Sequence, residues 1–445
     1  MRLKRLAIGI LLIAAVGYSH AITLKECIHI GLTNNLSLAN ARIGISKGQA
    51  TVSQNRARLL PMVNGVFQYT DYLKQPVNVT TGTVLGNDFP DDPTWQVIKS
   101  MQHNVNVGVQ LNLPLYNWGI YTAIDVAKVI ERLSRLSYEK AVEDLTVQIG
   151  NVYYLAQSFR EQVHLTDENI SRMQALCTIT EAMYEEGVVL EIDLDRARIN
   201  LRNLMATRNQ FDMLYEQQIN MLRFLLDYSP ETPLDVDRME ESVELFESVG
   251  ISSDLTVLRQ AEMQKELIER KIRVVNAGYL PSISLTGYAG GLSYQEKFSH
   301  FFHTAASSKN WFGNCFVGVN VSIRIFDANS KRLQIRQHRY DAEQAEIHAE
   351  QLRNSITRDY SNALLQINHN VEVYRTQLQS YRLAQEVYGV TEEQYREGIS
   401  SMTAILQDEM QLRTAQSACV QAHCQYNIAR LDLLRLTGKL SLLTE

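Results

Sequence analysis

The chain has 445 residues, of which 45% are hydrophobic and 21% are charged. This composition can supply a sizeable buried core and excludes a chain that is disordered throughout. The formal net charge of −6 gives no basic footprint, so we expect no nucleic-acid partner.

The N-terminus has the pattern of an export signal. Arg2, Lys4 and Arg5 precede an apolar run from Leu6 to Val16, and small residues occupy two positions of Ser19-His20-Ala21. About 11 apolar residues are too few for a membrane anchor, because a bilayer core needs roughly 20. We predict that residues 1–21 are a cleaved signal peptide. No later stretch is apolar for long enough to span a bilayer, so a membrane crossing would have to use β-structure.

Proline and glycine positions divide the rest of the chain. The eight prolines leave two tracts without proline, 115–229 and 282–445, in which long helices can form. Leu60-Pro61 closes a helical tract and opens a strand-like tract, and Leu280-Pro281 does the same further along the chain. We therefore expect helical and strand-like tracts to alternate.

Two strand-like tracts alternate between apolar and polar residues, as strands with one apolar face do. We predict strands at 104–113 and 316–325, with partner strands at 62–72 and 282–294 and loops at 73–103 and 295–313. The apolar positions are Val105, Val107, Val109, Leu111 and Leu113 in the first tract and Val317, Val319, Val321, Ile323 and Ile325 in the second.

The apolar strand faces need a covering surface. In a soluble sandwich they would pack on a second sheet, but four strands divided between distant parts of the chain suit that fold poorly. All three tryptophans, Trp95, Trp118 and Trp311, lie in or beside these strands, as the aromatic residues of outer-membrane barrels do. The smallest such barrels have about eight strands, so several chains would have to share one barrel wall.

The helical tracts have the spacing of a coiled coil. From Val142 to Cys177, apolar residues recur at steps of three and four. A helix from Trp118 to Tyr184 would be roughly 100 Å long at 1.5 Å per residue. Gly187 then marks a turn, and apolar residues beyond it continue the pattern. We predict long antiparallel helical hairpins.

Landmarks in the first half recur in the second. LNLPLYNWG (111–119) aligns with VSIRIFDAN (321–329) at an offset of 323 − 113 = 210 residues, and Tyr184-Glu185-Glu186-Gly187 resembles Tyr395-Arg396-Glu397-Gly398. We predict two structural repeats, at 22–228 and 251–445, joined by a linker at 229–250. Each has a helix, a strand hairpin (62–116; 282–326) and a long helical hairpin (118–228; 328–438).

This order of elements resembles the TolC family of outer-membrane efflux proteins over essentially the whole mature chain. The resemblance implies a mainly α fold with a small β-barrel portion, in which a homotrimer builds one twelve-stranded outer-membrane barrel from four strands per chain. It also implies that the helical hairpins form a tunnel across the periplasm. The partners that it implies are an inner-membrane pump, a periplasmic membrane-fusion adaptor and outer-membrane lipid.

The resemblance also implies that the hairpin tips form the periplasmic aperture. Asp193 stands at the family's acidic position in the first repeat, and Asp195 follows it. The second repeat departs from the family, because Ala404 and Gln407 occupy positions where acids are frequent and the first charges are Asp408 and Glu409. Three copies of Asp193 would influence one another electrostatically, or the acids could instead stabilise the first turn of the returning helix.

Four further tip residues are candidates. Tyr184 and Tyr395 could hydrogen-bond across closed tips, or could serve only in coiled-coil packing. Gly187 and Gly398 are expected turn residues and contact points for the adaptor.

No catalytic or cofactor chemistry is indicated. The chain has no phosphate-binding glycine loop, nucleophile elbow or HExxH motif. The five cysteines lack a CxxC pair, which disfavours a disulfide framework or zinc site, and we expect buried thiols. His300 and His303 have metal-like spacing only on a helix, and we expect them in an external loop as solvated or interfacial residues.

Three functions are compatible with these features. The first is the outer-membrane exit channel of a tripartite efflux system, passively conducting small molecules. The second keeps the architecture but serves type I protein secretion. The third, a soluble periplasmic coiled-coil scaffold or adaptor, is disfavoured because it would need no apolar-faced strands.

Overall fold

The structure is a computed structural model that describes residues 21–81, 95–239, 243, 250–252, 254–302 and 311–443. The predicted signal peptide, apart from Ala21, and much of the predicted linker lie outside the described residues. The chain forms two compact units. One contains Met1–Ser46, Leu133–Met263 and Ala345–Glu445, and the other contains Lys47–Arg132 and Gln264–Gln344.

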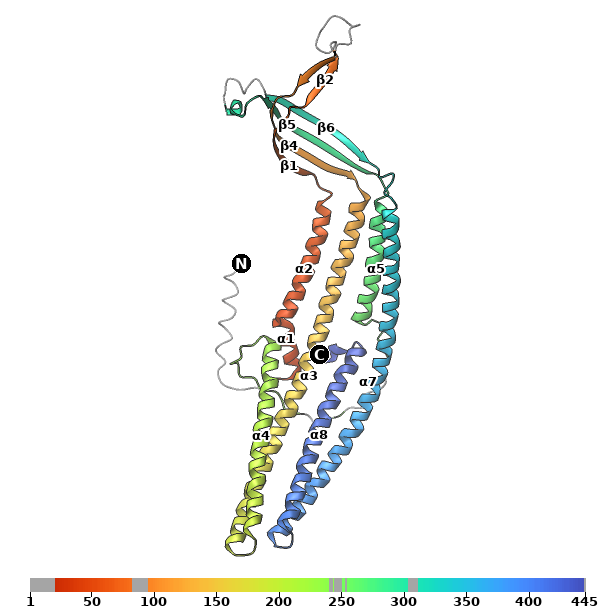
Figure 1. The fold of residues 1–445 in the computed structure, drawn as a ribbon. Helices are drawn as coiled ribbons and strands as arrows, with labels where there is room; N and C mark the ends of the chain where they lie inside the picture. The colour runs from red at the N-terminus through yellow and green to blue at the C-terminus, as the bar shows by residue number, and fades with distance from the viewer. Residues whose placement is uncertain are drawn as a thin grey trace. The chain divides into compact units, whose positions relative to one another are not determined.

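The second of these units contains a four-stranded antiparallel sheet (Figure 1). Its strands are β1 (Met62–Asp71), β4 (His103–Tyr116), β5 (Ser282–Gln295) and β6 (Trp311–Ser322). The order β1-β4-β5-β6 joins the two predicted hairpins, because β4 pairs with β5 as well as with β1. One continuous sheet thus draws strands from both halves of the chain.

The last strand is shorter than the sequence predicts. We expected it to continue through Ile325, but β6 ends at Ser322 and Ile323 and Ile325 lie beyond it. The ladder stops at the pair Ser282↔Ser322. Pro281 precedes that pair, and a proline has no backbone N–H with which to continue the ladder.

The strand register brings the predicted apolar positions onto one face of the sheet. Val109 pairs with Gly65 on β1 and Ala289 on β5, so these three residues share a face. The opposite face carries mostly amides and hydroxyls, but it also carries an aromatic pair that the alternation did not predict. The rings of Tyr288 and Phe316 stack there with centroids 5.9 Å apart.

One predicted loop contains a second small sheet. β2 (Val77–Thr81) and β3 (Trp95–Lys99) pair antiparallel inside the 73–103 segment. Each has only five residues, and Pro76 before β2 and Pro93 before β3 made the segment read as a loop. In the other predicted loop, a 3₁₀ turn, η2, covers Phe298–Phe302.

The helices have the lengths that the coiled-coil spacing predicts. α3 (Trp118–Glu185) has 68 residues and α7 (Ser330–Arg396) has 67. α4 (Glu191–Leu226) returns along α3, with ion pairs Arg198–Glu181 and Arg208–Asp167. α8 (Met402–Leu436) returns along α7 (Figure 1). The remaining helical elements are α1 (Leu24–Asn34), α2 (Leu36–Ala57), α5 (Thr256–Ala277) and η4 (Leu440–Leu443).

Asn35 separates α1 from α2. Its Oδ1 accepts hydrogen bonds from the backbone N–H groups of Ser37 and Leu38, at 2.9 and 3.3 Å. Its Nδ2 donates to the carbonyl of Leu225 at 2.9 Å. One buried amide thus caps α2 and satisfies a carbonyl near the C-terminus of α4.

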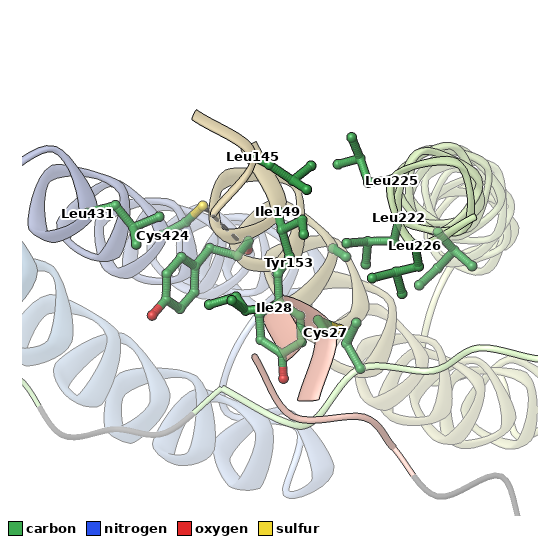
Figure 2. Packing of buried hydrophobic residues seen from close by; sticks show 14 of the residues in the cluster. Cys27, Ile28, Leu145, Ile149, Tyr153, Leu222, Leu225, Leu226, Cys424 and Leu431 are labelled. Carbon is green, nitrogen blue, oxygen red and sulfur yellow. Dashed lines mark hydrogen bonds between the residues drawn. The ribbon is translucent and has the colours of Figure 1, made fainter. Parts of the chain in front are cut away.

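The apolar core of the first unit gathers residues from α1, α3, α4 and α8. Figure 2 shows Ile28 close to Ile149 and Tyr153 of α3, with leucines of α4 nearby. Gly31 permits this approach, since a Cβ there would lie 2.4 Å from Ile149 Cδ1. Side-chain burial across several helices is the main stabilising term for such long helices.

The cysteines take no part in disulfides. Cys27, Cys419 and Cys424 are buried and Cys177 is half-buried, but Cys315 is exposed. The expectation of five buried thiols is therefore wrong for Cys315. It lies on β6, an edge strand of the sheet, where none of the described residues forms a layer over its face.

Candidate gate at the helical hairpin tips

Both hairpins turn at a glycine with a positive φ. Gly187 has φ 78° and Gly398 has φ 74°. At the first turn the Gly187 N–H donates to the Tyr184 carbonyl at 2.9 Å, and the second turn has the matching bond from Gly398 to Tyr395 at 3.0 Å. The left-handed backbone suits glycine because a Cβ would be strained there.

The two tip tyrosines lie in different surroundings. Tyr184 is 41% exposed, whereas Tyr395 is only 2% exposed and packs among apolar residues of both hairpins. The Tyr395 hydroxyl lies 3.1 Å from Oγ1 of Thr180 on α3. The structure therefore joins Tyr395 to the other hairpin of the same chain, and does not pair the two tyrosines with each other.

The Tyr395 hydroxyl is held in its neutral form. Burial raises its pKa above the ordinary value, and the Asp193 carboxylate adds to the increase. A neutral phenol can donate a hydrogen bond.

The predicted acids of the first tip are paired with arginines of their own helix. Asp193 Oδ1 lies 3.1 Å from Arg196 Nη1, and Asp195 Oδ1 lies 4.0 Å from Arg198 Nη1. Asp193 lies in the first turn of α4, where a negative charge is favourable. The N-cap residue of this helix, Leu190, makes no side-chain cap.

Asp408 connects the two helices of the second hairpin. Its Oδ2 accepts a hydrogen bond from Thr391 Oγ1 on α7 at 2.7 Å. At the start of α8, the helix that contains Asp408, Ser401 is the N-cap, and its side chain accepts a hydrogen bond from the N–H of Ala404 at 3.2 Å. Asp408 is thus used within its own hairpin.

Sequence reasoning missed a row of buried or half-buried polar pairs between the hairpins. We call this row the hairpin seam, and it consists of the pairs Thr180–Tyr395, Asn200–Glu409 and Asn169–Gln416. Asn200 Nδ2 donates to Glu409 Oε2 at 3.0 Å, and Asn169 Nδ2 donates to Gln416 Oε1 at 2.8 Å. Polar pairs of this kind fix the register of packed helices.

Two polar atoms in or beside the seam lack a hydrogen-bond partner among the described residues. They are Oε1 of Glu409, a residue that is 4% exposed, and the hydroxyl of Tyr388. Burial, together with the Glu392 carboxylate, raises the pKa of Tyr388 to about 12. The sequence carried a signal for Glu409, because it interrupts the apolar spacing of Ile405 and Leu412 with a charge.

Over the described residues, no group of three or more His, Cys, Asp or Glu side chains is placed to hold a metal ion. His300 lies in η2, and His303 lies outside the described residues. None of the helices described here has an apolar stretch that could cross a membrane.

The family profile described as outer membrane efflux protein matches residues 28–227 and 256–439. The chain belongs to the outer membrane efflux protein family. The expected relation to TolC is therefore confirmed.

Individual relatives in this efflux family are distant in sequence. The toluene efflux pump outer membrane protein TtgC of Pseudomonas putida is 23% identical over 442 residues, covering 95% of this chain and 84% of TtgC. The outer membrane protein TolC of Escherichia coli is 20% identical over 369 residues, covering 80% and 74%.

Solved structures of outer-membrane channels have the same fold. CmeC of Campylobacter jejuni has a TM-score of 0.72 at 18% identity, with 94% of this chain and 85% of CmeC covered. MtrE of Neisseria gonorrhoeae, described in its open state, has a TM-score of 0.72 at 19% identity, with 95% and 90% covered. The predicted fold class is thus confirmed for this efflux-family chain.

Proposed function

We propose that this chain is the outer-membrane exit channel of a tripartite efflux system. In this role it passively conducts small molecules that an inner-membrane pump and a periplasmic adaptor deliver. Family membership and the fold of known outer-membrane channels support the role. We infer that the protein is exported, with its signal peptide removed, and reaches the outer membrane.

The observation that carries the proposal is a four-stranded sheet with two edges that nothing in the described part of the chain covers. β1 and β6 are its edge strands, and they do not pair with each other. Large apolar side chains on both edges, including Phe67 and Val317, are exposed. Uncovered edges and an uncovered apolar face are costly in water, but they suit strands shared in a closed wall surrounded by lipid.

A homotrimer would meet this need. Three copies of β6 would pair with three copies of β1 and close one twelve-stranded barrel. The closed wall removes the edges, and the face that includes Val109 would contact lipid. The face that includes Asn112 would line the lumen.

The hairpin tips would form the gate of this channel. The hairpin seam holds the two hairpins of one chain together, and Asp193 would line a constriction formed with two other copies. Tyr184 remains exposed and available to a neighbouring chain. Opening would then separate hairpins that Tyr395 and Glu409 now join.

The tips would also receive the adaptor. Apolar residues that follow each turn glycine are exposed, among them Val188, Leu190 and Ile399. Exposed apolar residues beside a glycine turn suit a protein contact. Gly187 and Gly398 would lie in this contact.

The test is the mass of the purified protein in mild detergent, followed by its conductance in a planar bilayer. We expect a stable trimer and discrete single-channel currents. A stable monomer under these conditions would remove the shared barrel. A trimer that gives no current in any condition would retain the assembly and remove the conducting role.

A further inference from the structure

A buried lysine at the junction of β6 and α7 lacks hydrogen-bond acceptors. Lys331, in the first turn of α7, is 7% exposed, and its ammonium has no hydrogen-bond partner among the described residues. The nearest carboxylate oxygen, Asp327 Oδ2, is 3.8 Å away, beyond hydrogen-bond distance. The ring centroid of Tyr279 lies 4.6 Å from the ammonium nitrogen.

The local backbone already uses Asp327. Its Oδ2 accepts a hydrogen bond from the backbone N–H of Lys331 at 3.2 Å, and its carbonyl accepts one from Ser330 at 3.1 Å. Asp327 therefore caps α7 across a turn in which Ala328 and Asn329 both have positive φ. One distant carboxylate cannot satisfy an ammonium with three donors.

The aliphatic stem of Lys331 packs against Gly278. A Cβ at Gly278 would lie 2.8 Å from Lys331 Cε, so glycine directly after α5 leaves room for the lysine stem. Lys331 lines a cavity of about 580 Å³ together with Arg324 and Asp327. Two cations face one carboxylate, so the cavity has a net positive charge.

We propose that this cavity binds the phosphate group of a membrane lipid. Phosphate oxygens supply the acceptors that the Lys331 ammonium lacks, and charge-assisted bonds to them are strong. Arg324, which is exposed and also lines the cavity, adds a second cationic donor. A change in the terminal torsions of the flexible lysine chain turns its ammonium from the Tyr279 ring toward the cavity.

The surroundings favour a lipid over free phosphate. Arg324 lies between Ile323 and Ile325, and Phe326 follows. These three apolar residues are 59%, 94% and 81% exposed. An exposed apolar surface beside cationic side chains suits a lipid whose acyl chains and headgroup contact the same segment. The proposal rests on the outer-membrane location of the family and not on the conducting role.

The test measures lipid retention by native mass spectrometry of the full-length protein in detergent. Phosphatidylglycerol is titrated onto the wild type, Lys331→Met, Arg324→Gln and Arg336→Gln. Lys331→Met keeps an apolar stem against Gly278 and Tyr279, and Arg324 is exposed, so both variants should fold. Arg336→Gln is the matched control, because Arg336 is an exposed cation of α7 that does not line the cavity.

We expect Lys331→Met and Arg324→Gln each to weaken phosphatidylglycerol binding about tenfold, the change that losing one charge-assisted hydrogen bond produces. Arg336→Gln should leave the affinity unchanged. Diacylglycerol with the same acyl chains should not be retained.

Four results would overturn the proposal. Equal loss in Arg336→Gln would show general charge attraction, and equal retention of diacylglycerol would show that the phosphate is not recognised. If inorganic phosphate at the lipid concentration competed equally well, the ligand would be free phosphate. If Lys331→Met altered the mass of the assembly and left lipid retention unchanged, a neighbouring chain would fill the cavity.

Discussion

The Tyr395 hydroxyl donates to the Thr180 hydroxyl across the two helical hairpins of one chain, over 3.1 Å. The direction follows from Thr180, which gives its own hydrogen to the carbonyl of Leu176 at 2.8 Å. Both residues are buried. The packing of the two hairpins therefore includes a directed, buried bond, which the proposed opening would have to break.

Replacing Tyr395 with Phe tests that bond. The ring stays and the hydroxyl donor is lost, while Thr180 keeps its hydrogen bond to Leu176. We therefore expect the packing of the two hairpins to lose about 1 kcal/mol of stability. In single-channel recordings the open probability should rise several-fold for a change of this size. Tyr340→Phe is the matched control, because Tyr340 is an exposed residue of α7 outside the hairpin tips, and it should have little effect. Equal effects in both variants would contradict a special role for the buried pair.

Asp193→Ala tests the acidic constriction. Up to three negative charges would leave a narrow entrance, where fields are weakly screened. Reversal potentials should show lower cation preference, and block by multivalent cations should weaken. Asp408→Ala should change less, because Asp408 bonds within its own hairpin.

Arg196→Gln tests the same site and should change the cation preference in the opposite direction. It removes the cation that lies 3.1 Å from Asp193, so cation preference should increase. Unaltered selectivity in both Asp193→Ala and Arg196→Gln would leave stabilisation of the first turn of α4 as the better account of Asp193.

Gly398→Ala and Gly389→Ala should have opposite effects on thermal stability. Gly398 has φ 74°, and alanine there should cost roughly 1 to 2 kcal/mol. Gly389 lies inside α7 and a Cβ there meets nothing within 4 Å. Alanine there should stabilise by roughly 0.5 to 1 kcal/mol. Melting midpoints followed by circular dichroism measure both effects. If both variants shifted the midpoint in the same direction, the result would be inconsistent with a strained turn at Gly398.

His423 should make stability depend on pH. It is 5% exposed and its ring centroid lies 4.7 Å from that of Tyr374. Burial lowers its pKa from the ordinary 6.5 to about 4. Between pH 6.5 and about pH 4, His423 is protonated in the unfolded chain but neutral in the folded chain. The free energy of unfolding therefore falls as the pH drops through this range.

At pH 5 the loss attributable to His423 should be about 2 kcal/mol relative to pH 7. Denaturant midpoints at the two pH values measure it, and the flatter profile expected of His423→Phe isolates this residue. If the wild type and His423→Phe lost the same stability between pH 7 and pH 5, other groups would account for the acid sensitivity.

Val109→Arg and Asn112→Arg distinguish the two faces of the sheet. A charge on the lipid face costs about 2 to 4 kcal/mol near the membrane midplane, so Val109→Arg should block membrane assembly. Asn112→Arg should assemble, because its side chain would face the lumen. Heat-resistant trimers recovered from outer membranes report the outcome. Equal assembly of the two variants would mean that the faces are assigned wrongly.

The long helices could be predicted from local features of the sequence. Proline is absent from the region of α3, the apolar spacing holds through Ile149 and Met173, and Gly187 supplies the turn. These features act within a few residues of one another, so their result could be predicted without knowing the partner helix.

Hydrogen-bonded pairs of residues that are far apart in the sequence could not be predicted in the same way. Glu409 stands out as a charge in an apolar row, but nothing in its neighbourhood names Asn200, which lies on the other hairpin. The hydrogen bond from Asn35 to the carbonyl of Leu225 is another such pair. Such pairs depend on how helices far apart in the sequence are placed, which a local pattern does not encode.

The pairing of β4 with β5 sets an order for folding. α3, α4 and α5 separate these strands in the chain, so β4 leaves the ribosome before β5 exists to pair with it. During that interval β1 and β4 form at most a two-stranded ribbon, which is marginally stable and has open edges. Aggregation is the hazard for such a ribbon. If the chain is exported as we propose, the unpaired strands need protection from aggregation until the remaining strands are available. Loss of a periplasmic chaperone should then harm this chain more than a protein whose strands pair only with their nearest neighbours.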